Sequence, residues 1–206
     1  MIMIEELLLK RQQTREYDVN KLPNKKVVED ILAKAFKLTA SKQNLYPYKV
    51  HILGPDNKDF KKVFYDIVNH QPGGLQNWNV AQAPYCLIFT KRFVANPDPE
   101  IYDRMNNGEN YNVCDPKKYH KDNRSSAIEI GMFAKVLTTL VLEKNMDVSY
   151  TGCFPSYNDN KELWKKLPFI DDTVIFSMQF GYRFSDYSFK RKKEKKPDIN
   201  EVFNWV

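Results

Sequence analysis

The segment from about Asn123 to Asn145 restricts the fold most, because it has helical spacing and is apolar on nearly every side. Such a helix needs cover from other parts of a protein, either in the interior or at a subunit interface. Its most apolar part, Ala127 to Leu142, contains Glu129 and Lys135 and is too short to span a bilayer. The segment therefore predicts a central helix of a globular protein and no transmembrane segment.

Shorter periodic segments lie on both sides of this helix. Asn24 is a plausible N-cap for an amphipathic helix that ends near Leu38. The run at 84–89 is apolar throughout, which indicates a strand buried on both faces. Helical spacing also predicts helices at 5–11, 59–69 and 159–167, and the remaining apolar runs predict strands at 48–53, 147–150 and 173–182.

Composition and charge limit the class of protein. A chain of 206 residues with 42% apolar residues can bury one core, so we expect a single domain spanning 1–206. The amino terminus has no signal-peptide pattern, and three widely spaced cysteines favour reduced thiols, so we expect a cytoplasmic protein. Six basic residues at 190–196 account for most of the net charge of +6, which makes the basicity a property of the tail.

Several common chemistries have no support in the sequence. The seven glycines form neither a GxGxxG nor a Walker A pattern, and no GxSxG is present. His51, His70 and His120 lack HExxH spacing, so no metal site is predicted. The pair Asp171 and Asp172 follows Pro168 and precedes a strand, which is typical of a turn.

Polar side chains gather in two stretches that flank the first long helix. The earlier stretch runs from Arg11 to Tyr17, and the later one runs from Ser41 to Tyr48. The later stretch connects a helix to a strand and presents a hydroxyl, an ammonium and two amides within four residues. Binding sites are often built on such connections, so both stretches are candidate site segments.

Two further segments have no clear periodicity. Residues 95–122 are rich in proline, asparagine and tyrosine, and a connection of this length predicts a substrate lid or a variable insertion. The tail at 190–206 is basic at first and then apolar, with Ile199, Val202, Phe203, Trp205 and Val206. An apolar terminus of this kind is expected to cover another surface.

The order of these features resembles the nitroreductase family. Arg11-Gln-Gln-Thr-Arg-Glu-Tyr17 is similar to that family's Arg-x-Ser-x-Arg/Lys-x-Phe/Tyr, and Ser41-Lys-Gln-Asn-Leu-Tyr-Pro-Tyr48 is similar to its Ser-x-x-Asn-x-Gln-Pro-Trp. The long apolar helix, Asp147-Val-Ser-Tyr-Thr-Gly152, Phe180-Gly-Tyr182 and the basic tail follow in the same order. Gln13, Tyr46 and Lys195 depart from the family pattern, in which Ser, Gln and often Arg stand at these positions.

The resemblance implies an α+β fold in which a mainly antiparallel central sheet is sandwiched by helices. It also implies a homodimer with an exchanged C-terminal segment and FMN sites at the subunit interface. Arg11, Lys193 and Lys195 would hold the FMN phosphate, because a doubly charged group calls for charged donors. The other cofactor-binding residues that it implies are Gln12, Gln13, Arg15, Ser41, Lys42, Gln43, Asn44, Tyr150, Thr151 and Gly152.

Within that picture Arg15 would lie near the N1 and C2 carbonyl edge of the flavin ring, where a fixed positive charge favours the reduced form. Tyr150, Thr151 and Gly152 would line the ring near N5, and the Ser41–Asn44 stretch would come from the other subunit. A further flavin contact before the second strand stays unassigned between Asn77 and Asn79. No catalytic side chain is predicted, because the flavin carries the chemistry.

The expected function is an FMN-dependent oxidoreductase that uses NAD(P)H to reduce a nitro compound, a quinone or a similar acceptor by ping-pong hydride transfer through flavin N5. One alternative is an oxygen-using or dehalogenating relative, similar to dimethylbenzimidazole synthase or iodotyrosine deiodinase, with 95–122 as its lid. An alternative of another class is a nucleic-acid-binding protein that uses the basic tail. That tail lacks the interleaved aromatic residues suited to base stacking, which makes nucleic acid the less favoured partner.

Overall fold

A computed structural model describes residues 4–69, 83–94, 103, 107, 123–184 and 197–203 of the chain. The basic tail with Lys193 and Lys195, the candidates Asn77 and Asn79, and nearly all of the 95–122 segment lie outside the described residues. The expectations that concern them therefore stay predictions.

The helices and strands follow the periodicity of the sequence closely. The helices are α1 (Ile4–Lys10), α2 (Lys25–Leu38), α3 (Lys58–Asn69), α6 (Arg124–Glu143), α7 (Lys161–Trp164) and α8 (Ile199–Val202), with a 3-10 turn η1 (Lys42–Asn44). The strands are β1 (Tyr48–Leu53), β2 (Tyr85–Lys91), β3 (Asp147–Thr151) and β4 (Val174–Gly181). Asn24 caps α2 as predicted, because its side chain accepts a hydrogen bond from the Lys26 N–H at 2.8 Å.

The strands form one antiparallel sheet in the order β1-β2-β4-β3. Strand β2 lies inside the sheet, where Cys86 pairs with Leu53 on one side and with Gln179 on the other. All of β2 except Lys91 is buried, which confirms the prediction of a strand covered on both faces. Strand β3 lies at an edge of the sheet, so one row of its backbone groups faces away from β4.

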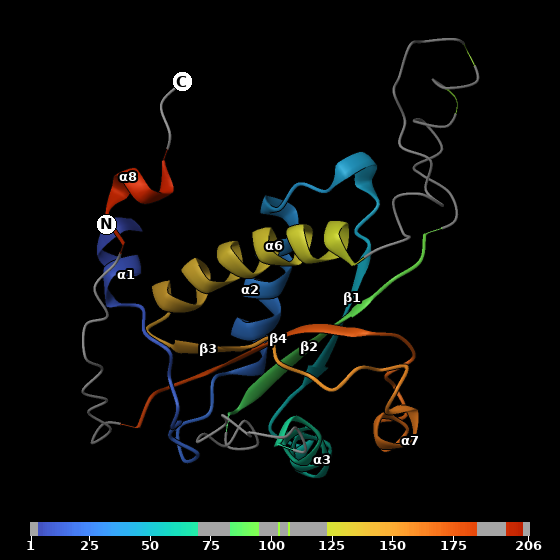
Figure 1. Cartoon of the computed structure of the whole chain (residues 1–206). Helices are drawn as coiled ribbons and strands as arrows, with labels where there is room; N and C mark the ends of the chain where they lie inside the picture. The colour runs from blue at the N-terminus through green and yellow to red at the C-terminus, as the bar shows by residue number, and fades with distance from the viewer. Residues whose placement is uncertain are drawn as a thin grey trace.

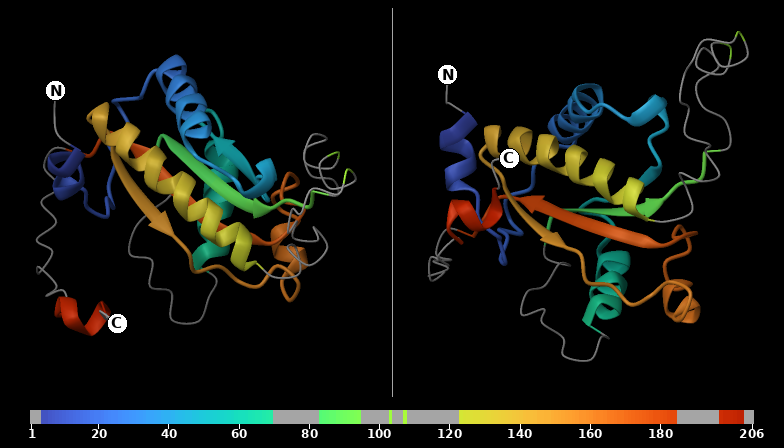
Figure 2. Two further views of the ribbon diagram at one scale, coloured as in Figure 1. Left: turned by 90° about the horizontal axis from the view of Figure 1, so that it is seen from above. Right: turned by 45° about the horizontal axis from the view of Figure 1, so that its top comes forward.

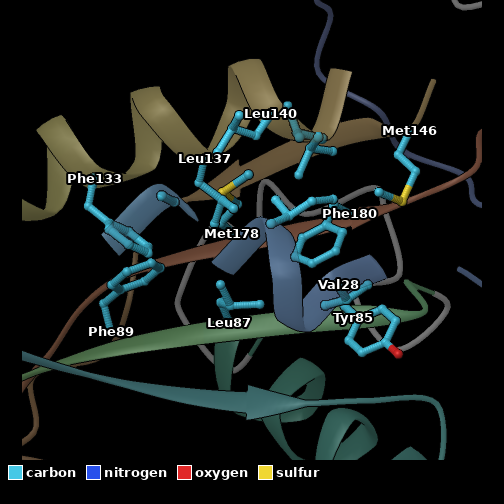
Figure 3. Close-up of a cluster of buried hydrophobic side chains, with 14 of the residues drawn as sticks. Val28, Tyr85, Leu87, Phe89, Phe133, Leu137, Leu140, Met146, Met178 and Phe180 are labelled. Atoms are coloured by element: carbon cyan, nitrogen blue, oxygen red, sulfur yellow. The ribbon is translucent and has the colours of Figure 1, made fainter. Parts of the chain in front are cut away.

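Helices cover both faces of this sheet (Figures 1 and 2). Helices α2 and α6 lie over one face, and α3 and α7 lie on the other. The core under α6 contains Leu87, Phe89, Leu137, Met178 and Phe180, which meet between the helix and the strands (Figure 3). The architecture is therefore a mainly antiparallel sheet between two helical layers, as expected.

Helix α6 is the central helix that the sequence predicts. By length and composition alone it could cross a membrane, yet 56% of its most apolar window is buried inside the protein. That degree of burial is typical of a core helix. Ile128 and Met132 remain exposed at 56% and 43%, so α6 also presents an apolar strip to the outside.

A fully buried polar network joins the first segment of the chain to the sheet. The Tyr17 hydroxyl lies 2.8 Å from Ser149 Oγ and donates to the Gln179 carbonyl at 3.1 Å. The Gln179 amide in turn donates to Ser177 Oγ at 2.7 Å and lies 3.7 Å from Cys86 Sγ. Burial raises the pKa of the Cys86 thiol to about 12, so this cysteine is an inert thiol.

Candidate functional site

The segment Arg11–Arg15 lies along the edge of β3. The Thr14 N–H donates to the Val148 carbonyl at 3.0 Å, and Gln13 forms a parallel bridge with Val148. The chain after α1 thus uses backbone groups of β3 that β4 does not reach. This pairing fixes the first polar stretch against the residues that precede Gly152.

The Gln13 side chain continues this pairing in place of a strand backbone. Its amide N–H donates to the Tyr150 carbonyl at 2.8 Å, and its amide oxygen accepts from the Tyr150 N–H at 3.2 Å. Both halves of the amide are therefore engaged with the edge strand. Gln13 positions β3 relative to the segment that carries Arg11, and its direct contact with a cofactor stays a prediction.

Arg11 and Tyr150 form the most informative contact of the site. The guanidinium carbon of Arg11 lies over the Tyr150 ring, 4.5 Å from the ring centroid. The Arg11 Nε is buried and has no hydrogen-bond acceptor among the residues that the structure describes. A buried guanidinium donor without an acceptor is costly, so this position favours an anionic ligand.

Two threonine hydroxyls near the same edge are also buried and have no hydrogen-bond partner among the described residues. Thr14 is fully buried, Thr151 is 3% exposed, and neither Oγ1 contacts an acceptor or donor within the described part of the chain. Both belong to the stretches that flank the Gln13–Tyr150 pairing. Together with Arg11 Nε they give this edge unused hydrogen-bonding capacity, which suits a polar ligand.

The other predicted residues of this edge lie beside the pairing. Gln12 and Arg15 are half-buried, and Gly152 is exposed. A Cβ placed on Gly152 would meet nothing within 4 Å, so open space adjoins the backbone there. The structure therefore brings Arg11, Gln12, Gln13, Arg15, Tyr150, Thr151 and Gly152 to one sheet edge.

The second polar stretch is held at the amino-terminal end of α6. The buried carboxylate of Glu129 accepts from the Lys42 N–H at 3.2 Å, and Ser126 donates to the Pro47 carbonyl at 2.9 Å. Within the turn, Ser41 Oγ accepts from the Tyr46 N–H at 2.7 Å. Asn44 is exposed, and the Gln43 side chain lies outside the described part of the chain.

The turn at 41–46 contains two residues with positive φ, a backbone conformation that residues other than glycine rarely adopt. Asn44 has φ of 55° and Tyr46 has φ of 42°. A non-glycine residue in this region costs on the order of 1–3 kcal/mol and needs support from its surroundings. Tyr46 receives that support from Phe36, whose ring centroid is 4.6 Å away, and from a 3.2 Å hydrogen bond to the Thr39 carbonyl.

One copy of the chain keeps the two polar stretches apart. The η1 turn contacts α6 at Glu129, whereas Tyr150 contacts α6 nine residues later, at Thr138. At 1.5 Å per residue these two contacts are about 14 Å apart along the helix axis. Figure 1 shows the same separation, with η1 and α1 near opposite ends of α6.

Sequence reasoning did not assign roles to Ser126, Glu129, Thr138 or Arg92. Arg92 donates to the carbonyls of Leu45 and Tyr46 at 3.3 and 3.1 Å. A polar residue at a buried position of an apolar helix was the available signal for Glu129 and Thr138, since such a group needs a partner. No sequence signal pointed to Arg92.

A cavity of about 650 Å³ is lined by residues outside the two polar stretches. It is lined by residues of α3 and of the 19–22 loop, together with Pro55 and Pro84. None of the predicted site residues that the structure describes lines it. Volume alone does not define a binding site, and the unsatisfied donors point instead to the β3 edge.

Comparisons with solved structures identify the fold. No family model matches the chain, and no curated protein sequence matches it. Solved structures do match over nearly the whole chain. A putative nitroreductase from Exiguobacterium sibiricum, in complex with FMN, has a TM-score of 0.71 at 16% identity and covers 100% of this chain and 98% of its own.

Two other solved structures agree. A putative NAD(P)H:FMN oxidoreductase from Staphylococcus epidermidis has a TM-score of 0.67 at 14% identity, covering 100% of this chain and 97% of its own. A nitroreductase-like protein from Streptococcus mutans has a TM-score of 0.65 at 15% identity, covering 99% and 100%. At these identities the likeness establishes the fold alone. The chain therefore has the α+β fold of nitroreductase-like proteins.

Proposed function

We propose that this protein is an FMN-dependent oxidoreductase that uses NAD(P)H to reduce a nitro compound, a quinone or a similar acceptor. The observation that carries the proposal is the Arg11 guanidinium, which lies over the Tyr150 ring with its buried Nε lacking an acceptor among the described residues. A donor prepared in this way matches the phosphate of FMN.

The residues present also fit the rest of that cofactor. Its ribityl chain carries hydroxyl groups, and Thr14 and Thr151 offer buried hydroxyls without partners in the described part of the chain. Open space beside Gly152 leaves room for a planar ring near the β3 end. Support from outside the chain comes from the similar Exiguobacterium structure, which is an FMN complex.

Bound FMN would supply the redox chemistry by accepting a hydride from NAD(P)H at N5 and passing electrons to the acceptor. The role of the protein is to bind and orient. Arg11 would hold the phosphate, Arg15 would place a positive charge near the N1 edge of the ring, and Gln13 would fix β3 through its two hydrogen bonds to Tyr150. No acid-base pair is needed for such a site.

We further propose that two copies complete each site. The Ser41–Asn44 turn lies about 14 Å along α6 from the Tyr150 contact, so the turn of a second copy is better placed to face the β3 edge. The exposed side chains of Ile128 and Met132 on α6, and of Ile199, Val202 and Phe203 near the carboxyl end, provide apolar surface for such a dimer.

Flavin titration combined with a turnover assay tests the proposal. Arg11→Ala should weaken FMN binding roughly 10- to 100-fold, because a charged hydrogen bond contributes about 1.5–3 kcal/mol. The control is Lys166→Ala, an exposed lysine beyond α7, which should leave FMN binding unchanged. FMN-dependent oxidation of NADH or NADPH with a nitro or quinone acceptor is the expected activity, and its absence from FMN-loaded protein would contradict the proposal.

A further inference from the structure

The Tyr150 hydroxyl forms a hydrogen bond with Thr138 of α6, and the other bond of Thr138 determines which hydroxyl is the donor. Thr138 is fully buried, and its hydroxyl donates to the Ala134 carbonyl at 2.6 Å. A threonine hydroxyl has one proton, so Thr138 Oγ1 can only accept from Tyr150. The Tyr150 O–H therefore donates to Thr138 Oγ1, which anchors the far end of the ring on α6.

The rest of Tyr150 is also fixed. Its backbone N–H and carbonyl are both bonded to the Gln13 amide, at 3.2 and 2.8 Å. The ring packs beside Phe176 of β4, with 5.5 Å between centroids. Tyr150 is thus held at its backbone, its ring and its hydroxyl, which makes it a rigid support for a group on its open face.

The group on this face of the Tyr150 ring is the Arg11 guanidinium. Its guanidinium carbon lies 4.5 Å from the ring centroid, and no carboxylate among the described residues forms an ion pair with it. An aromatic face orients a guanidinium, whereas a carboxylate would compete with an incoming anion for its N–H donors. The donors of Arg11 therefore stay available to a ligand.

We infer that Tyr150 is a positioning residue that holds the Arg11 guanidinium for the phosphate of the flavin nucleotide, and that it does not act through contact with the flavin ring. The inference rests on the proposed function and replaces the expectation that Tyr150 lines the ring near N5. It predicts that the protein binds FMN more tightly than riboflavin, and that this preference depends on an aromatic side chain that does not itself touch the phosphate.

The test compares FMN with riboflavin, which lacks only the phosphate. Tyr150→Leu removes the ring face and should weaken FMN binding roughly 3- to 30-fold, with riboflavin affinity unchanged within about twofold. Tyr150→Phe keeps the ring and should retain the FMN preference. In an Arg11→Ala background, Tyr150→Leu should have no further effect on FMN affinity.

Fluorinated phenylalanines incorporated at position 150 provide a second series that preserves the shape of the ring. FMN affinity should fall stepwise as fluorination weakens the ring quadrupole, and riboflavin affinity should stay constant. Equal weakening of both ligands, or no change in either, would overturn the inference in both series. A wild-type protein that binds neither ligand would instead contradict the proposed function, and the inference with it.

Discussion

Glu129 of α6 accepts a hydrogen bond from the backbone N–H of Lys42 at 3.2 Å, and this buried carboxylate is 4% exposed. Ser126, three residues earlier, donates to the Pro47 carbonyl at 2.9 Å. Residues three apart lie on the same side of a helix, so one side of α6 holds both ends of the turn at 42–47.

Glu129→Ala should therefore destabilise the protein and loosen this turn. Loss of the acceptor removes a part-buried hydrogen bond from the Lys42 N–H to a charged carboxylate, and a bond of this kind contributes about 1–3 kcal/mol. Glu129→Gln keeps an acceptor oxygen and should cost less. Urea unfolding measures the stability of both variants, and equal stability of Glu129→Ala and the wild type would show that the contact is not needed.

Gly181 has a steric role at the end of β4. A Cβ at this position would lie 2.5 Å from Pro84 Cδ and 3.3 Å from Tyr17 Cδ1. Gly181→Ala should lower the free energy of unfolding by about 1–3 kcal/mol, because the backbone around Pro84 has to move. The matched control is Gly54→Ala, whose nearest neighbour would be a Tyr85 ring atom at an ordinary 3.5 Å. A larger loss of stability in the control than in Gly181→Ala would contradict this assignment.

His51 should make stability depend on pH. Its pKa is lowered by burial and by Lys49, and the neutral ring hydrogen-bonds with Thr90 Oγ1 at 3.0 Å. With a folded pKa below the unfolded value of about 6.5, the unfolded state takes up the proton first as the pH falls. Stability should decline from about pH 6.5 downward, and His51→Asn should reduce that decline in urea unfolding. An identical pH dependence in the variant would rule out His51 as a source.

The carboxyl-terminal segment should matter for assembly. Ile199, Val202 and Phe203 are 67%, 62% and 59% exposed in one copy of the chain. Covering them with a second copy contributes on the order of a few kcal/mol, so deletion of residues 198–206 should weaken both the dimer and FMN binding. Val19→Ser, which alters an exposed valine in a loop, serves as control. Sedimentation of the truncated protein as an intact, FMN-loaded dimer would contradict the exchange of this segment.

Much of the fold can be predicted from local sequence signals, whereas the candidate site can be predicted from them only in part. The Asn24 cap, the apolar run of β2 and the spacing of α6 are local signals, and each element formed as predicted. Helix α7 is shorter than the predicted 159–167, spanning Lys161–Trp164. The chain after it continues through single turns, with Leu167 N–H donating to the Trp164 carbonyl at 2.9 Å.

The remaining features depend on contacts between distant residues. The position of β2 between β1 and β4 is set by strand pairing, which sequence periodicity does not encode. The engagement of Gln13 with Tyr150 joins residues 137 positions apart. The resemblance named both residues as flavin contacts, but their contact with each other appears only in the folded chain.

Mixed dimers test whether each site is shared. Arg11→Ala and Asn44→Ala should each lower flavin occupancy, because the two residues would serve the same site from different copies. A dimer assembled from one copy of each variant should regain about one normal site. Equal FMN occupancy in the mixed and the parental variant dimers would place each complete site within one chain.

The absorption spectrum of the purified protein, recorded before and after incubation with FMN and removal of free ligand, tests the central claim most directly. Our account predicts bands near about 375 and 450 nm, the range expected of oxidised flavin. It also predicts close to one FMN per chain, and markedly less in Arg11→Ala. A folded protein that stays colourless after incubation with FMN would contradict the account.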